Sequence, residues 1–220
     1  SFLKKGQLNL PKFKYYAQQI LEALAFCHSN KIAHRDIKPD NIFLDKYGHA
    51  KIADFGFAKE FLDKARSSER CGSLMYCSPE ILNDPSFDPF QADIWALGVT
   101  FYYMATGKFP YSHHSIDLLE QSVMLGLIDF SKVDLNPKIK SLIGKMTAKI
   151  PRLRPSFEEL LKNPLFNNRT KSVSLIKPIS YNSGSKCINK VFPHRLNFVQ
   201  SFTTETTSFD EMRQTKISAY

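Results

Sequence analysis

The feature that most constrains this chain is a run of mostly polar residues, His-Arg-Asp-Ile-Lys-Pro-Asp-Asn at 34–41, which lies between two segments of regular pattern. Before it, apolar residues recur at helical spacing over 11–28, behind a proline suited to a first turn, and predict an amphipathic helix. After it, β-type runs at 41–45 and 50–53 flank Gly48 and predict a hairpin. The polar run is therefore expected to form a loop between a helix and a hairpin.

After the hairpin the periodicity is helical throughout. A largely apolar helix is predicted at 92–106, because Gly107 and then Pro110 give the order expected of a C-terminal stop. From about residue 167 the composition shifts to Ser, Thr, Asn and Lys, which predicts a flexible tail at 167–220 after a folded domain at 1–166. Further helices are predicted at 116–125, 137–146 and 156–162.

The composition fits a soluble globular protein, because 43% of the 220 residues are apolar. The longest apolar stretch, at 94–105, is shorter than the roughly 20 residues that cross a bilayer, so no transmembrane segment is expected. The net charge of +9 is spread along the chain, and we expect no nucleic-acid partner. The cysteines form no CxxC pair and lie beside no histidine at finger spacing, so we expect reduced thiols and an intracellular, cytoplasmic location.

Two further motifs follow the polar run in a fixed order. Asp-Phe-Gly occupies 54–56, and Ser-Pro-Glu occupies 78–80. Together the three motifs resemble the protein kinase family, serine/threonine type, although a serine replaces the alanine of the third motif. The resemblance covers roughly 1–166 and points to the calcium/calmodulin-dependent and AMP-activated group. It implies an α+β, protein kinase-like fold whose C-terminal lobe is predominantly helical and carries a short hairpin.

The resemblance also implies phosphoryl transfer from ATP to a Ser or Thr hydroxyl of a protein substrate. Asp36 would orient the acceptor hydroxyl and take its proton, and Lys38 would neutralise charge on the transferred group. Asn41 and Asp54 would hold Mg²⁺ against the phosphates, and Phe43 is implied to lie in the nucleotide site with them. Taken singly, each aspartate also fits a turn residue. Their joint occurrence at this spacing favours the kinase assignment.

Four further residues match positions that support the site in the family. Ser73 falls where a hydroxyl bonds the catalytic aspartate and lysine, although a surface turn serine is the alternative. Glu80 matches a glutamate that pairs with a late arginine, here Arg154. Asp93 matches an aspartate at the start of the central helix, which braces the catalytic loop. The resemblance therefore implies that these residues hold the site in place.

Glu69 stands where many related kinases carry a phosphorylated threonine held by two cations, here Arg35 and Lys59. We hypothesise that Glu69 supplies a built-in anion that orders the activation loop without phosphorylation. A carboxylate brings one charge where a phosphate brings about 1.5 to 2, so the clamp is expected to be weaker. The alternative is a solvated surface glutamate, and Ser67 and Ser68 stand as alternative phosphorylation sites.

The sequence contains no glycine-rich phosphate loop, and no lysine and glutamate of the kind that the family pairs ahead of these motifs. We therefore expect the N-terminal lobe to be absent from this chain and catalysis to require it. The alternative hypothesis is a noncatalytic truncated lobe that acts as a binding or scaffolding module. Cations interleaved with Ile and Phe over 167–220 leave calmodulin as a weaker candidate partner, against a solvated linker.

Overall fold

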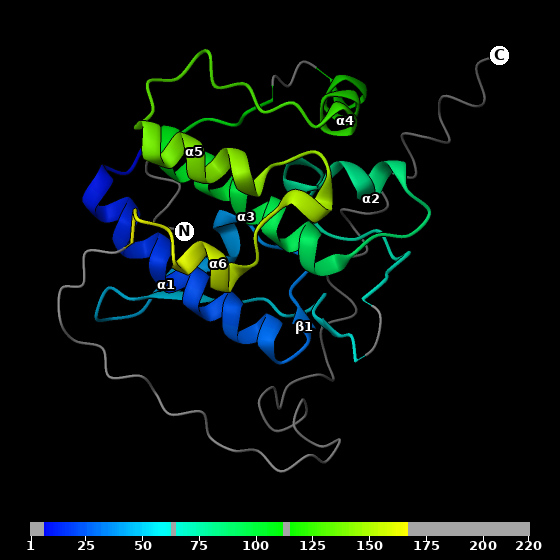
Figure 1. The fold of residues 1–220 in the computed structure, drawn as a ribbon, viewed down its shortest axis with the longest axis horizontal. Coiled ribbons are helices and arrows are strands. Elements are labelled where there is room, and N and C mark those ends of the chain that lie inside the picture. The colour runs from blue at the N-terminus through cyan, green and yellow to red at the C-terminus, as the bar shows by residue number, and fades with distance from the viewer. Residues whose placement is uncertain (1–6, 63–64, 112–114, 167–220) are drawn as a thin grey trace, which may run out of the picture. The chain divides into compact units, whose positions relative to one another are not determined.

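A computed structural model describes residues 7–62, 65–111 and 115–166 of the chain (Figure 1). These residues form a mostly helical unit with two small sheets, as expected from the fold class predicted above. The predicted tail at 167–220, together with its calmodulin alternative, lies outside the described residues. The domain boundary at 166 stays a prediction.

The helix α3, Pro89–Thr106, lies at the centre of this unit and is buried on most of its surface. It begins before the predicted residue 92, because the Asp88 side chain accepts two backbone N–H groups of the first turn and a proline occupies the first position. It ends at Gly107, whose φ of 68° lies in the left-handed region that favours glycine. No helix in the described ranges is both long and apolar enough to span a membrane.

The helix α1, Leu10–Ser29, confirms the first predicted helix and packs against α3. The Asn9 side chain caps it by accepting the Lys12 backbone N–H at 3.1 Å. The Phe13 ring meets Phe101 of α3 edge-on, with ring centroids 5.4 Å apart. The buried face of α1 consists of Phe13, Ala17, Ile20, Leu21, Leu24 and Ala25.

Four shorter helices complete the helical part of the described residues. The helices α4, Ile116–Leu125, and α5, Pro137–Met146, have the predicted bounds. The helix α6, Phe157–Leu161, falls one residue short of the prediction at each end, because Ser156 forms a capping box with Glu159 and Lys162 is the C-cap. The helix α2, Pro79–Asn83, and the short 3₁₀ turns η2 (Pro39–Asn41), η3 (Leu74–Tyr76) and η4 (Pro151–Leu153) were not predicted.

The predicted hairpin is confirmed by the antiparallel strands β2, Ile42–Leu44, and β3, Ala50–Ile52. Asp45 closes the connection, because its Oδ1 accepts the backbone N–H groups of Tyr47 and His49, each at 2.9 Å. The hairpin therefore lies directly after the polar loop, as its sequence pattern indicates.

The expectation of purely helical structure after the hairpin is wrong at 59–60. The strand β4, Lys59–Glu60, pairs antiparallel with β1, Ile32–Ala33, so a second small sheet forms. Both β4 side chains are exposed, and the segment therefore lacks the apolar alternation that reveals a half-buried strand. Its pairing with β1 places the chain after the Asp-Phe-Gly motif beside the entry to the polar loop.

The contact between α3 and α5 leaves no room for a side chain at Gly98. A Cβ built there would lie 2.7 Å from Thr147 Cγ2 and 3.0 Å from Met146 Cβ. We predict that Gly98→Ala lowers the free energy of unfolding, because overpacking costs about 1–3 kcal/mol whereas the gain in helix propensity is about 1 kcal/mol. Chemical denaturation measures the difference.

Gly144 provides the matched control for that substitution, because it also lies inside a helix but a Cβ there would meet no atom within 4 Å. Gly144→Ala is expected to raise the free energy of unfolding by about 0.5–1 kcal/mol. Equal stabilisation by both substitutions would contradict the packing argument for Gly98.

Candidate active site

Asp36 lies at the centre of a cluster of hydrogen bonds and is only 5% exposed. Its Oδ2 lies 2.8 Å from Lys38 Nζ and accepts a hydrogen bond from Asn41 Nδ2 at 3.0 Å. Its Oδ1 accepts the Ser73 hydroxyl at 3.3 Å, and Lys38 Nζ donates to the Ser73 oxygen at 2.9 Å. The structure thus brings together four of the residues singled out from the sequence, and charge-assisted hydrogen bonds hold the carboxylate in one orientation.

The polar loop that carries Asp36 closes on itself over a few residues. Pro39 begins η2, and Asn41 ends it with its side chain turned back toward the start of the loop. There Asn41 Nδ2 donates a second hydrogen bond, to the Asp36 backbone oxygen, at 2.8 Å. This local closure fixes the distance between the two side chains without help from the rest of the fold.

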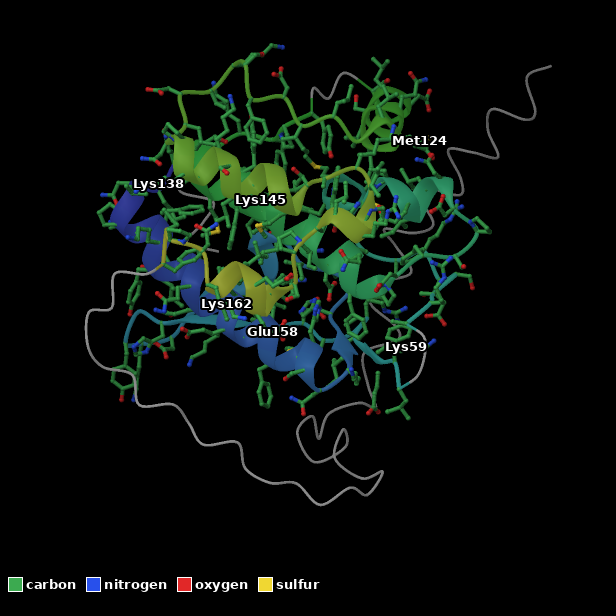
Figure 2. The ribbon with its side chains drawn as sticks, in the orientation of Figure 1. Lys59, Met124, Lys138, Lys145, Glu158 and Lys162 are labelled. Carbon is green, nitrogen blue, oxygen red and sulfur yellow. The ribbon has the colours of Figure 1, made fainter. Side chains whose placement is uncertain are left out.

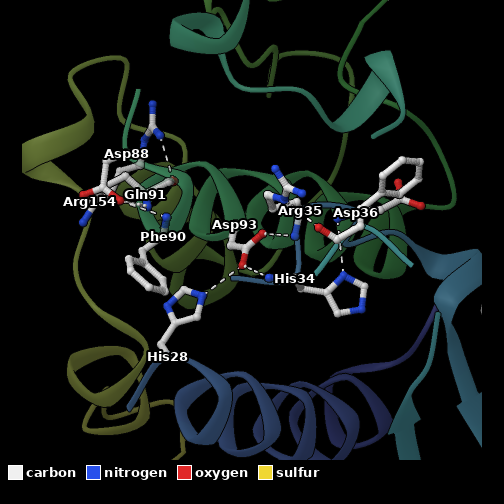
Figure 3. A network of polar contacts seen from close by, with 10 residues as sticks. His28, His34, Arg35, Asp36, Asp88, Phe90, Gln91, Asp93 and Arg154 are labelled. Atoms are coloured by element: carbon white, nitrogen blue, oxygen red, sulfur yellow. Dashed lines mark hydrogen bonds and ion pairs between the residues drawn. The ribbon is translucent and has the colours of Figure 1, made fainter. Parts of the chain in front are cut away.

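A buried carboxylate of α3 anchors the beginning of the same loop (Figure 3). Asp93 accepts the backbone N–H of His34 at 2.7 Å and that of Arg35 at 2.8 Å, and it lies 3.0 Å from His28 Nε2. Arg35 has a φ of 66°, a left-handed conformation that is costly for a residue other than glycine. Asp93 therefore stabilises the backbone turn that places Asp36.

Asp54 lies on the solvent-exposed side of the site and has a φ of 58°, which aspartate tolerates better than most residues. One of its oxygens accepts the Gly56 backbone N–H at 3.3 Å. The neighbouring ring of Phe55 packs against His34, with centroids 4.8 Å apart, and His34 Nε2 lies 3.1 Å from the Ala53 oxygen. His34 thereby connects the polar loop to the segment that carries Asp54.

Known proteins are similar to most of this chain. A family model described as protein kinase domain matches residues 1–166. The chain belongs to the protein kinase family. It is similar to sperm motility kinase Z of Mus musculus, with 35% identity over 71% of this chain, and to the SNF1-related protein kinase catalytic subunit alpha KIN12 of Arabidopsis thaliana, with 31% identity over 80% of it.

The kinase relatives are considerably longer than this chain. The match covers 31% of the mouse protein and 35% of the Arabidopsis protein. A third relative, the SNF1-like protein kinase ssp2 of Schizosaccharomyces pombe, is 29% identical over 97% of this chain and 37% of its own length. The chain therefore spans about a third of the length of the relatives it matches, and these relatives include SNF1-like and sperm motility kinases.

A buried ion pair joins the Ser-Pro-Glu motif of this kinase chain to a segment near residue 154. Arg154 NH1 and NH2 donate to the two carboxylate oxygens of Glu80, at 2.5 and 2.8 Å. Arg154 also donates to the backbone oxygens of Ala148 and Gln91, at 2.8 and 2.9 Å, and lies over the Trp95 ring. The pair is bidentate and its remaining donors are engaged, which is the arrangement that a buried charge requires.

Glu69 bridges two cations, as the sequence hypothesis requires of a built-in anion. Its carboxylate accepts hydrogen bonds from Arg35 NH1 at 2.7 Å and from Lys59 Nζ at 2.8 Å. The hydrogen bond from Lys59, then that from Arg35, lowers the pKa of Glu69 from 4.5 to about 2. Arg35 also donates to the Phe57 oxygen at 2.6 Å. The segment before Ser73 is thereby tied to the loop that carries Asp36.

Two residues that the sequence reasoning did not assign help to position the site. His28 ends α1 and contacts Asp93, but one histidine in a last helical turn gives no local signal of such a partner. Gly72 has a φ of 89°, and a Cβ there would lie 2.6 Å from the Arg35 backbone oxygen. A glycine directly before Ser73 is a signal in the sequence from which a close approach of two backbone segments could have been predicted.

The remaining predicted residue, Phe43, lies on β2 and is 49% exposed. The thiols of Cys71 and Cys77 line one cavity together with Asp36. Burial raises the pKa of both thiols, that of Cys77 to about 12. A thiolate nucleophile is therefore disfavoured beside Asp36.

Proposed function

We propose that this chain is the substrate-side lobe of a serine/threonine protein kinase that transfers a phosphoryl group from ATP to a protein hydroxyl. The observation that carries the proposal is the Asp36 carboxylate, which is held by Lys38, Asn41 and Ser73 at distances of 2.8–3.3 Å. Phosphoryl transfer depends mainly on positioning and charge neutralisation, and this cluster supplies both.

Each residue has a separate task in this proposal. Asp36 accepts the proton of the substrate hydroxyl and directs its oxygen toward the phosphoryl group. Lys38 places a positive charge where the transferred group gains negative charge, and the Ser73 hydroxyl keeps the lysine and the aspartate aligned. Phe43 offers an exposed aromatic face for the nucleotide.

Asn41 and Asp54 fit a magnesium ion in their donor chemistry. Asn41 uses its amide nitrogen toward Asp36, so its carbonyl oxygen is left for a hard cation, and Asp54 is an exposed carboxylate. Mg²⁺ binds proteins through one or two such oxygens together with phosphates and water. When bound, the ion supplies neutralisation of the phosphate charge. Within the described ranges no cluster of three or more His, Cys, Asp or Glu residues offers a competing metal site.

The proposal is tested with the intact natural protein that contains these residues. Transfer of labelled γ-phosphate from ATP to a mixture of Ser- and Thr-containing peptides is expected in the presence of Mg²⁺ and is expected to stop when the metal is chelated. Acid hydrolysis of the product should release phosphoserine or phosphothreonine. A protein that binds peptides but transfers no phosphate would instead support the scaffolding alternative.

Within this function, Glu69 acts as the anion that orders the segment before Ser73 without phosphorylation. Support comes from its two cationic partners, Arg35 and Lys59, of which Arg35 directly precedes Asp36. The same contacts lower the pKa of Glu69 from 4.5 to about 2, so the folded form binds its proton less tightly than the unfolded form. The stabilisation is therefore present above pH 4.5 and is lost as the pH falls through about 2.

We predict that the Glu69→Gln variant melts at a lower temperature than the native protein above pH 4.5, and that this difference shrinks as the pH is lowered toward about 2. Differential scanning calorimetry over this range provides the comparison. Asp134→Asn, an exposed carboxylate, serves as the control. A Glu69→Gln difference that is independent of pH, or unchanged activity of unphosphorylated Glu69→Ala, would contradict the built-in anion.

A further inference from the structure

The segment 135–157 carries six cations and no aspartate or glutamate. One of the six, Arg154, is buried and paired with Glu80. The other five are exposed, and they are Lys138, Lys140, Lys145, Lys149 and Arg152. The exposed surface of α5 and of the turn after it is therefore uniformly positive, in contrast to the mixed charges of an ordinary solvated face.

These cations have few partners among the described residues. No acidic side chain of the described ranges lies within ion-pair distance of the five, and Lys140 packs its ammonium over the Phe130 ring at 5.5 Å. Lys145 occupies the last turn of α5, where the helix dipole favours a cation. Lys149 and Arg152 lie beyond the end of that helix, so the helix dipole does not explain why cations occupy these two positions.

Exposed aliphatic side chains alternate with the cations beyond α5. Ile150 is 47% exposed and Leu153 is 63% exposed, on either side of Arg152 in sequence. The end of α4 adjoins this turn, because a Cβ on Gly126 would lie 3.5 Å from Lys149 Cγ. The residue after it, Leu127, is 68% exposed. Figure 2 shows Lys145 on α5 and Met124 at the end of α4 in the upper half of the view.

We propose that this basic–aliphatic surface, formed by Lys149, Arg152, Leu127, Ile150 and Leu153, binds reversibly to a membrane rich in anionic phospholipid. Its cations match anionic headgroups, and its leucine and isoleucine side chains reach the boundary between headgroups and acyl chains. An acidic protein or a nucleic acid would use the cations but gives no reason for aliphatic side chains between them. The binding is independent of phosphoryl transfer and does not rest on the proposed function.

Vesicle co-sedimentation with the full 220-residue chain tests the proposal. Binding is expected to phosphatidylcholine vesicles that contain phosphatidylserine, to be absent without phosphatidylserine, and to weaken as salt screens the charges. The Lys149→Glu/Arg152→Glu variant should bind at least tenfold more weakly, since each cation near an anionic surface contributes about fivefold. The Ile150→Ser/Leu153→Ser variant should also bind more weakly but keep its salt dependence.

The matched control is Lys12→Glu/Lys14→Glu, which makes the same change of charge in the first two turns of α1, where the helix holds no acidic residue before Glu22. It should bind the vesicles as the native chain does. The proposal is overturned if this control loses as much vesicle binding as the Lys149→Glu/Arg152→Glu variant, or if that variant binds the vesicles as strongly as the native chain. The proposal is also overturned, in favour of an acidic protein partner, if the native chain binds no vesicles but binds a polyaspartate peptide that the Lys149→Glu/Arg152→Glu variant does not bind. Thermal melting verifies that each variant is folded. If the Lys149→Glu/Arg152→Glu variant does not fold, the Lys149→Gln/Arg152→Gln variant takes its place.

Discussion

Asp36→Asn is expected to lower the rate of phosphoryl transfer by the intact protein by about 10²–10⁴-fold, equivalent to about 3–5 kcal/mol in the barrier. The amide cannot accept the proton of the substrate hydroxyl. Lys38 and Asn41 both donate hydrogen bonds to the carboxylate. The amide of the variant would therefore bring a further donor, its N–H₂ group, to a position where an acceptor is needed. The effect should fall on kcat, measured with saturating peptide and ATP, whereas peptide binding should change little.

The stability of the Asp36→Asn variant separates a chemical effect from a structural one. Because Lys38 keeps its contact with Ser73, the thermal midpoint should shift by only a few degrees while the activity is lost. Asp134→Asn changes an exposed carboxylate of the same type and should leave both quantities unchanged. Activity of the Asp36→Asn variant within about threefold of the native value would remove Asp36 from the proposed chemistry.

Arg154→Ala is expected to lower the free energy of unfolding by about 3–5 kcal/mol, a large part of the 5–15 kcal/mol that holds a domain of this kind together. The substitution leaves Glu80 buried, at 5% exposure, without its counter-ion. It also removes the donors to the Ala148 and Gln91 oxygens. Equilibrium denaturation in urea measures the loss.

The neighbouring Arg152→Ala is the control for this experiment, because Arg152 is exposed and should contribute no more than about 0.5 kcal/mol. A double-mutant cycle with Glu80→Leu and Arg154→Met isolates the ion pair. The double variant should be less destabilised than the sum of the two single variants by about 1–3 kcal/mol, because it leaves no unpaired buried charge. Additive single effects would show that the pair is not coupled. If Arg154→Ala does not fold, Arg154→Lys provides a milder test of the same contact.

The helices and the hairpin could be predicted from the sequence because their determinants are local. The bounds of α4 follow from Ser115, which caps its start, and from Gly126, which ends it in a left-handed conformation. The same holds for the closure between Asp36 and Asn41, which are five residues apart. In contrast, β4 has two exposed charged side chains and becomes a strand only through its partner β1. No period in the sequence could reveal it.

The motifs of the sequence predicted which residues gather at the site, and the family resemblance implied the roles proposed for them. The motifs could not supply the contact of His28 with Asp93, which are 65 residues apart. The basic–aliphatic surface was also hidden, because Gly126 and Lys149 are distant in sequence and adjacent only in the folded chain. The run of six cations without an acidic residue over 135–157 is visible in the sequence, but the exposure of five of them beside exposed aliphatic side chains is not.

The sequence by itself determined the family, the main helices, the hairpin and the local geometry of the polar loop at 34–41, because each depends on motifs or on residues within a few positions of one another. Only the tertiary structure decided the second sheet, the contact of His28 with Asp93, the close approach of Gly72 to the Arg35 backbone and the composition of the exposed surfaces. Those features depend on contacts between residues far apart in the chain, and such contacts form only when α1, α3 and α5 pack around one core.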